Sequence, residues 1–253
     1  MTGAELLAVL AAGFGAGILT STVGVASLLS FPVLVAVGLP PVVANTTNTL
    51  GMTPAGLSGS FGYRRELSAY PAVTRTVLIT SGVGAVAGSL LLLLLDPEVF
   101  EALAPWLILG TCVLVGIQTR VTAWVRRHAT EPAGARVTLS PLTRFFATLT
   151  GVYGGYFGAG SGVMMLAVLG FGVDLDFRIL NALKTAAVMA ANVVASLVFL
   201  AIAEIDWVAA GVLAAGSVFG GYVGSHIGRR LPPGLLRSLI VVFGVTAALT
   251  MLM

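Results

Sequence analysis

Charged residues are scarce in this sequence of 253 residues, making up only 9% of the chain. A soluble domain carries about 25% charged residues, whereas this chain is 57% hydrophobic and has a mean hydropathy of +1.02. The low charge excludes an ordinary soluble protein. Uncharged stretches such as 76–95 and 207–225 reach the roughly 20 residues that a helix needs to cross a bilayer. We therefore predict an all-α polytopic membrane protein.

Other absences narrow the function further. The single cysteine, Cys112, excludes a disulfide framework or a cysteine-based metal site, and no cofactor or metal is expected. No Gly-x-x-x-x-Gly-Lys-[Ser/Thr] loop is present, so the chain is not itself an ATP-driven pump, although a partner ATPase subunit stays open. Acidic residues lie only near segment ends, which disfavours a cation transporter. The net charge of +3 is attributed to cytoplasmic loops and not to nucleic-acid binding.

The apolar segments fall into two groups of five. Residues 1–125 form the first predicted transmembrane repeat, 126–140 a cytoplasmic linker, and 141–253 the second repeat. Two segments are short for a crossing at 1.5 Å per residue and are interpreted as half-spans, tilted pieces or parts of broken helices, which leaves eight to ten transmembrane segments. The ten segments are 4–22, 25–38, 41–62, 71–95, 100–121, 142–160, 162–173, 178–203, 207–228 and 234–253.

The two halves resemble each other in sequence. Glycines at positions 13, 17 and 24 align with glycines at 151, 155 and 162 at one constant offset. After a slip of two residues, Asn45 aligns with Asn181 and Ser60 with Ser196. The alternative to a true repeat is chance similarity among glycine-rich apolar helices.

Loop charges predict that the repeats are inverted. The loops at 64–75, 120–144 and 229–237 are rich in arginine and are placed in the cytoplasm, which leaves the acidic turns 96–101 and 204–206 outside. Both termini then lie on the extracytoplasmic side, and each half crosses an odd number of times. Inverted repeats with broken helices that meet near the midplane are a recurring transporter design.

The run Asn45-Thr46-Thr47-Asn48-Thr49 is the most unusual stretch. Five hydrogen-bonding side chains in a membrane segment must face protein, water or a ligand. Pro40 and Pro41 precede the run and can start a helix, whose first N–H groups and positive dipole end favour an anion. We interpret the run as lining a substrate site. The alternative is that it joins helices by hydrogen bonds.

The matched stretch in the second half, Asn181 to Thr185, contains Lys184, the only lysine in the chain. An ammonium inside a membrane is costly, so we interpret Lys184 as a counter-charge for an anion. Two alternatives are that Lys184 reaches the membrane interface or that it pairs with Asp174 or Asp176. Asn192 lies further along the same helix.

The segment breaks supply further candidate ligands. Thr20 to Gly24 interrupts one apolar run and Gly158 to Gly162 interrupts its mate; glycine lets the backbone open, and Ser or Thr can donate to an oxyanion. Other glycines recur every four residues, as close helix packing in membranes requires. The predicted substrate-binding residues are Asn45, Thr46, Thr47, Asn48, Thr49, Ser21, Thr22, Ser161, Asn181, Lys184, Thr185 and Asn192.

At these motifs the chain resembles the TauE/SafE (sulfite exporter, TSUP) family. The stretch GFGAGILTSTVGVASLLSFPVLVAVGLPPVVANTTNT resembles its first repeat, and GVYGGYFGAGSGVMMLAVLGFGVDLDFRILNALKT resembles the second. Two positions depart from the family pattern: Val25-Ala26-Ser27 replaces Gly-Gly-Gly, and Gly170 replaces a proline. The resemblance implies movement of sulfite, organosulfonates or related anions across the bacterial cytoplasmic membrane.

The sequence therefore predicts a carrier that moves a small sulfur-containing anion by alternating access, with no enzymatic activity. A passive anion channel remains an alternative. A rhomboid-like serine protease using Ser161 and His226 is a second alternative, although Ala159 leaves its Gly-x-Ser-Gly motif incomplete. A proton-relay role for His226 also stays open. The expected partners are the anion and the lipid bilayer, and assembly into a homo-oligomer is not decided.

Overall fold

The computed structural model describes residues 1–22, 25–128, 137–227 and 233–252, without the side chains of 21–22, 224–227 and 233–237. The described residues form eleven helices and no strand, which confirms the predicted all-α fold. The helices are α1 (Gly3–Thr22), α2 (Ser27–Ala36), α3 (Pro41–Gly62), α4 (Arg64–Ala69), α5 (Pro71–Leu94), α6 (Pro97–His128), α7 (Pro141–Tyr156), α8 (Ser161–Gly172), α9 (Phe177–Ile202), α10 (Trp207–Ile227) and α11 (Pro233–Leu252).

Each predicted apolar segment contains one of these helices. Prolines occupy the first turns of α3, α5 and α7, where a missing N–H group costs nothing because the first N–H groups of a helix have no partner inside it. Two features differ from the prediction. The short helix α4 was expected to be loop, and α6 continues to His128, into the start of the predicted linker.

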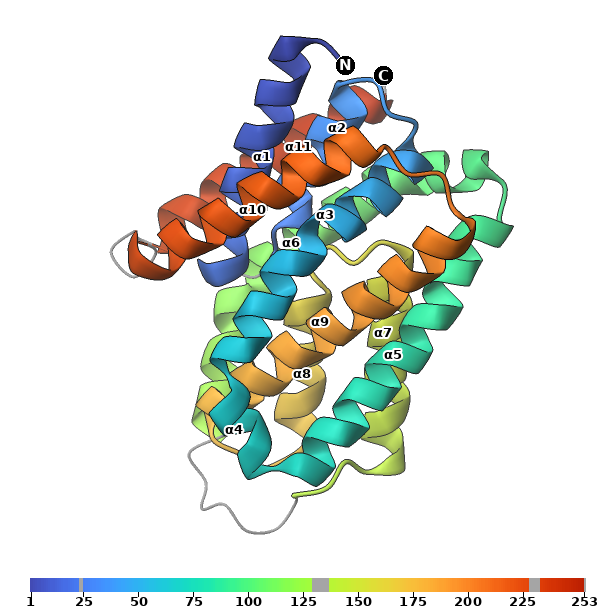
Figure 1. Cartoon of the computed structure of the whole chain (residues 1–253). Coiled ribbons are helices and arrows are strands. Elements are labelled where there is room, and N and C mark those ends of the chain that lie inside the picture. Colours follow the sequence, from blue (N-terminus) through green and yellow to red (C-terminus); the bar gives the residue numbers. More distant parts are fainter. Residues whose placement is uncertain (23–24, 129–136, 228–232, 253) are drawn as a thin grey trace.

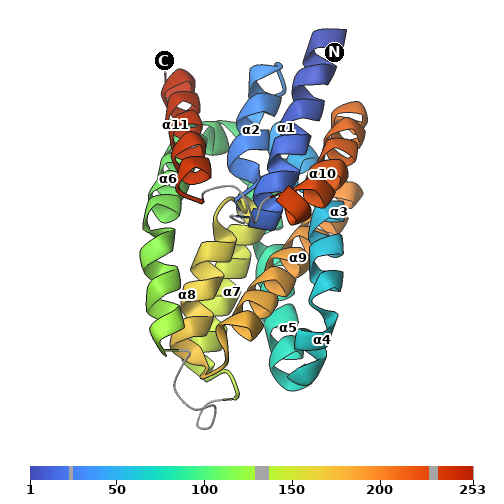
Figure 2. The ribbon, with the colours of Figure 1, turned by 90° about the vertical axis from the view of Figure 1, so that its left-hand side faces the viewer.

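The helices of the two repeats run in opposite directions. In Figures 1 and 2 both termini lie at one end of the molecule, while α4, the end of α6 and the start of α7 lie at the other. Helix α1 runs inward from the first end, and α7 runs inward from the second. The division of the chain into two inverted repeats stays a prediction. Which end faces the cytoplasm remains a prediction, and Arg229 and Arg230 lie outside the described residues.

The most extensive helix–helix contacts join helices of different repeats. Helix α1 packs along α10, and α5 packs along α7. In the repeat, α1 corresponds to α7 and α10 corresponds to α5, so each of these two contacts is the counterpart of the other. Glycines permit both contacts, because a Cβ atom at Gly84 would overlap the Thr148 carbonyl and one at Gly220 would overlap the Phe14 carbonyl. The two repeats are therefore interleaved and do not stand as separate bodies.

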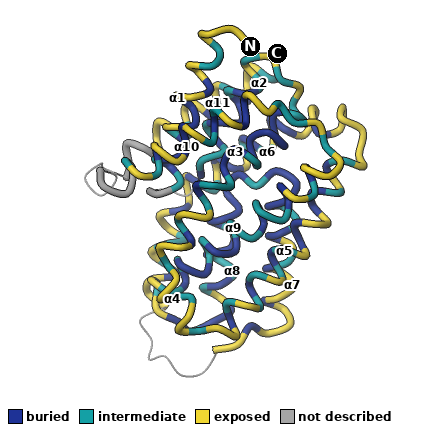
Figure 3. The backbone as a smooth tube through the Cα atoms, viewed as in Figure 1, coloured by how far each residue is buried: buried dark blue, intermediate teal, exposed yellow. Residues whose placement is uncertain are grey.

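The surface is apolar in the manner of a membrane protein. Among the described residues, α1, α5, α6 and α9 are long and apolar enough to cross a bilayer, and shorter apolar helices accompany them. Large side chains such as Leu94 and Phe61 are 80% and 68% exposed, which suits contact with lipid. Figure 3 shows the exposed residues on the outer sides of the helices. The chain is a multi-pass membrane protein.

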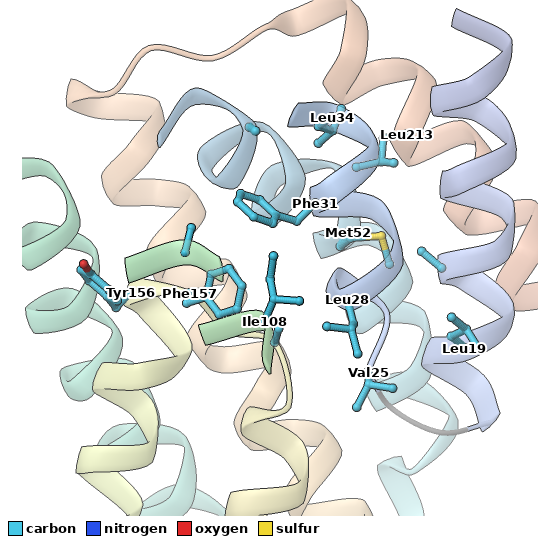
Figure 4. Packing of buried hydrophobic residues seen from close by; sticks show 14 of the residues in the cluster. Leu19, Val25, Leu28, Phe31, Leu34, Met52, Ile108, Tyr156, Phe157 and Leu213 are labelled. Atoms are coloured by element: carbon cyan, nitrogen blue, oxygen red, sulfur yellow. The ribbon is translucent and has the colours of Figure 1, made fainter. Parts of the chain in front are cut away.

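A hydrophobic cluster holds the centre of the molecule around the helix breaks. Phe31 of α2 contacts Phe157 edge to face, with ring centroids 5.3 Å apart, and Phe100 of α6 packs on both rings. Figure 4 shows Leu28, Met52 and neighbouring side chains converging on the same region. This packing fixes where α2 and the α7–α8 break lie, and so positions the site described next.

Candidate substrate site

Two helix breaks face each other at the centre of the fold. One lies between α1 and α2, and the other, residues 157–160, lies between α7 and α8. Gly158 and Gly160 have φ values of +81° and +78°, a backbone region that glycine adopts without strain. Helices α2 and α8 contain 10 and 12 residues and are about 15 and 18 Å long at 1.5 Å per residue. Each is about half of the roughly 30 Å of a hydrocarbon core, as expected for broken helices.

A cavity of about 80 Å³ lies where the two breaks meet. Both breaks contribute to its wall, and α3 and α9 close it from the other sides. The cavity therefore draws on both repeats. Its lining residues are Thr20, Val25, Ala26, Ser27, Met52, Gly56, Gly158, Ala159, Gly160, Ser161, Gly162, Lys184, Thr185, Val188, Met189 and Asn192.

Lys184 supplies the charge in this cavity. Within the described part of the chain its ammonium has no ion-pair or hydrogen-bond partner, and the alternative pairing with Asp174 or Asp176 is not formed. No Asp or Glu is among the described residues that line the cavity. A free cation with no carboxylate beside it favours an anionic ligand.

Uncommitted hydrogen-bond donors surround the lysine. The side chains of Ser27, Ser161 and Asn192 have no hydrogen-bond partner among the residues that the structure describes. Helices α2 and α8 begin at the cavity without a side-chain cap, so the positive ends of two helix dipoles point toward it. Thr185 also lines the cavity, but its hydroxyl donates to the Asn181 carbonyl at 2.8 Å.

The polar run of α3 lies elsewhere and is already hydrogen-bonded. Asn45 donates to the Tyr156 carbonyl, Thr46 donates to the Glu204 carbonyl, and Thr47 accepts from the Asp206 N–H group. Asn48 accepts from the Ser30 hydroxyl, and Thr49 donates to the Asn45 carbonyl. These side chains tie α3 to α2, to the end of α7 and to the loop before α10. None of the five lines the cavity.

The remaining predicted residues include some that line the cavity and some that do not. Asn181 donates to the Tyr63 hydroxyl at 2.9 Å and lies outside the cavity wall. The side chains of Ser21 and Thr22 lie outside the described part of the structure, as does that of His226. The structure thus gathers four of the predicted residues at one cavity: Ser161, Lys184, Thr185 and Asn192.

The cavity also includes residues that the sequence analysis did not select. Met52 and Gly56 of α3 are the repeat mates of Val188 and Asn192 of α9 at the same offset that aligns Asn45 with Asn181. Applying that offset to Asn192 would have identified Gly56. Thr20 belongs to the segment break at 20–24 that the sequence marks, whereas Ser27 and Met189 carry no comparable signal. Within the described residues, no three His, Cys, Asp or Glu side chains gather as a metal site would require.

The model for the sulfite exporter TauE/SafE family matches residues 9–251, nearly the whole sequence. The chain belongs to the TauE/SafE family.

Curated relatives carry the names of transporters. A probable membrane transporter protein of Haemophilus influenzae is 28% identical over 95% of this chain and 92% of its own length. The Sinorhizobium protein ORF9, also named a probable membrane transporter, is 28% identical over 95% and 90%. Escherichia coli YfcA, with the same description, is 24% identical over 90% and 82%. No solved structure matches the chain. The TauE/SafE assignment confirms the resemblance noted from the motifs and supports a membrane transporter.

Proposed function

We propose that this TauE/SafE protein carries a small sulfur-containing anion, sulfite or a close analogue, across the bacterial cytoplasmic membrane. The observation that carries the proposal is the unpaired Lys184 in a cavity that no described carboxylate lines. Lys184 would neutralise the anion. Ser161, Asn192 and Ser27 would donate to its oxygens, which charge-assisted hydrogen bonding makes the stronger contacts.

The position of the cavity suits alternating access. The cavity lies between α2 and α8, which come from different repeats and extend toward opposite ends of the molecule (Figure 2). Movement of one broken helix and its neighbours would open the cavity to one side, and movement of the mate would open it to the other. The anion would stay near the centre while access changes around it.

Cavity size favours compact ligands. A water-sized sphere takes about 10–15 Å³ by this measure, so 80 Å³ holds on the order of five such spheres. Sulfite, with one sulfur and three oxygens, fits this space, whereas taurine or sulfoacetate would need the cavity to widen. We therefore expect sulfite to bind more tightly than organosulfonates.

Loop charge supports an orientation in the membrane. Arg64, Arg65, Arg126 and Arg127 lie on α4 and the end of α6, at the end of the molecule opposite the termini (Figure 1). Because Lys and Arg concentrate on the cytoplasmic side, this end would face the cytoplasm and both termini would lie outside.

Loss of the Lys184 charge tests the site. Lys184→Gln keeps a polar side chain of similar reach but removes the charge, and we expect sulfite affinity to fall about 10- to 100-fold, as for loss of a charged hydrogen bond. Affinity is measured as the sulfite-dependent rise in melting temperature of the purified protein. Arg178→Gln is the matched control: it removes a cation from the same helix, where Arg178 pairs with Glu66 and lies outside the cavity. Full sulfite stabilisation of Lys184→Gln would contradict the assignment.

A transport assay separates the carrier from the channel. In proteoliposomes preloaded with unlabelled sulfite, a carrier accelerates entry of labelled sulfite by one-for-one exchange. Entry that internal sulfite does not accelerate, together with single-channel current steps, would instead establish a channel. Neither result depends on which residues bind the anion.

A further inference from the structure

A second, smaller gap lies directly beside the anion cavity. It has a volume of about 10 Å³ and lies between α5, α7, α8 and α9. Ser161 and Val188 line both the gap and the cavity. Ser81 and Thr150 contribute the other hydroxyl groups of the gap. Its volume corresponds to one water molecule, for which the minimum is about 10–15 Å³.

Ser81 is the unusual member of this group. Its side chain is fully buried, and its hydroxyl oxygen has no hydrogen-bond partner. An unpartnered buried hydroxyl costs about 1–3 kcal/mol, so native proteins usually satisfy it with a protein group or an ordered water. Thr150 donates to the Phe146 carbonyl and keeps its acceptor capacity, and Ser161 has both donor and acceptor capacity free.

The repeat mate of Ser81 shows how this serine would otherwise be satisfied. Ser217 is also fully buried, and its hydroxyl donates to the Ala214 carbonyl of its own helix at 2.9 Å and to the Gly51 carbonyl of α3 at 3.1 Å. At the same offset Gly51 corresponds to Ala187, which lines the gap. A Cβ atom at Gly51 would lie 2.7 Å from the Leu213 side chain, so glycine permits the close approach of α3 to α10.

Ala187 lines the gap at the position where its repeat mate is a glycine. The Ser81 hydroxyl has no partner on α9, whereas the Ser217 hydroxyl reaches the Gly51 carbonyl of α3. The space that remains is the size of one water and is bounded by three hydroxyls. A cation is a poor occupant, because Ser161 begins α8, whose positive dipole end lies here, and Lys184 lies on the wall of the adjoining cavity.

We propose that this gap holds one ordered water that joins Ser81 to Ser161 and thereby orients Ser161 toward the anion. The water donates to Ser161, so the Ser161 hydroxyl hydrogen is left to point into the anion cavity. Ser81 is then a positioning residue that acts through the water and does not touch the substrate. This inference rests on the proposed anion site.

A thermodynamic cycle tests the positioning role. Ser81→Ala should weaken sulfite binding roughly five-fold, the effect of one hydrogen bond of about 1 kcal/mol. In a Ser161→Ala background, Ser81→Ala should cause no further loss of affinity, because its effect passes through Ser161. Equal losses in both backgrounds, or no loss in either, would overturn the inference. Ser217→Ala is the matched control and should lower the melting temperature without changing sulfite affinity.

A second variant covers the case in which Ser81→Ala does not fold. Ala187→Gly should let Ser81 reach the carbonyl of residue 187 and expel the water, which weakens sulfite binding by a similar factor. Unchanged affinity in a folded Ala187→Gly variant would count against the water.

The water itself can be observed independently of transport. A high-resolution structure of the wild-type protein should show density between Ser81 and Ser161, and an empty gap would refute the proposal. If the water is present but the wild-type protein binds no sulfite, the proposed function fails and the orienting role fails with it. If sulfite binds in a Lys184-dependent way and Ser81→Ala has no effect, only the present inference fails.

Discussion

Helices α3 and α9 occupy matched places in the two repeats but carry different chemistry. Asn48 of α3 is buried and hydrogen-bonded to Ser30, whereas its mate Lys184 of α9 faces the cavity without a partner. Gly56 of α3 presents no side chain to the cavity, whereas its mate Asn192 presents an amide. Helix α3 therefore contributes mainly structural hydrogen bonds, and α9 contributes most of the candidate ligands. The scaffold is close to symmetric, and the site within it is not.

This difference separates two demands on a carrier. Opening to either side calls for equivalent halves, which the exchanged packing of α1 with α10 and of α5 with α7 provides. In the proposed function, one cation matches a singly charged anion such as hydrogen sulfite, and a second lysine at position 48 would leave an uncompensated charge. Divergence at a few matched positions meets both demands.

The largest expected effect is a loss of stability, and it tests the two equivalent contacts, α1 with α10 and α5 with α7. Gly84→Ala and Gly220→Ala each place a Cβ atom against a backbone carbonyl, and backbone cannot move aside as a side chain can. We expect each to cost about 3 kcal/mol or more, the upper range for overpacking, and to lower the yield of folded protein. Thermal unfolding in detergent measures the loss.

Gly110→Ala is the control for these variants, because nothing lies within 4 Å of a Cβ atom at that position. It should leave the melting temperature unchanged or raise it slightly, since alanine favours helix. If only one of the two interface variants is destabilised, the two helix pairs are not equivalent in the way the repeat implies.

An intermediate effect, a loss of stability, is expected from a change at Asn48, the α3 member of the matched pair Asn48 and Lys184. Asn48→Ala removes the 2.5 Å acceptor of the buried Ser30 hydroxyl and leaves it only the Ala26 carbonyl at 3.4 Å, so it should cost about 1 kcal/mol of stability. Sulfite affinity should stay within about two-fold of wild type, because Asn48 does not line the cavity. Unfolding and sulfite titration of the same sample check both parts. A large loss of affinity with normal stability would return Asn48 to the substrate site.

The smallest effect, a loss of sulfite affinity, concerns the matched pair Gly56 and Asn192. Asn192→Gly gives α9 the residue that α3 has at this point, and removes one candidate donor to the anion. We expect sulfite affinity to fall roughly five-fold, as for one neutral hydrogen bond. Gly110→Ala serves as the control here too, because Gly110 does not line the cavity and nothing lies within 4 Å of a Cβ atom there. An unchanged affinity in Asn192→Gly would remove Asn192 from the site.

Most of the fold could be predicted from the sequence. Long uncharged runs in a membrane favour helix, so the segment positions followed directly, and Pro40 and Pro41 stand at the start of α3 as predicted. Helix α4 was missed because its residues, Arg64 to Ala69, carry the charges of a loop. Lys184 was identified because a lysine among apolar residues is costly wherever it points.

The sequence by itself determined that the chain enters a membrane and that Lys184 stands out, and it predicted that the two halves are related. Each of these properties depends on composition and order along the chain. Only the tertiary structure decided which polar side chains face the cavity. Asn45 to Thr49 are as polar as Asn192, but four of them bond to partners on α2, α7 and the loop before α10, and none lines the cavity. Whether a polar group in a membrane protein is a ligand or a tie between helices depends on what packs against it, and that depends on residues more than a hundred positions away in the chain.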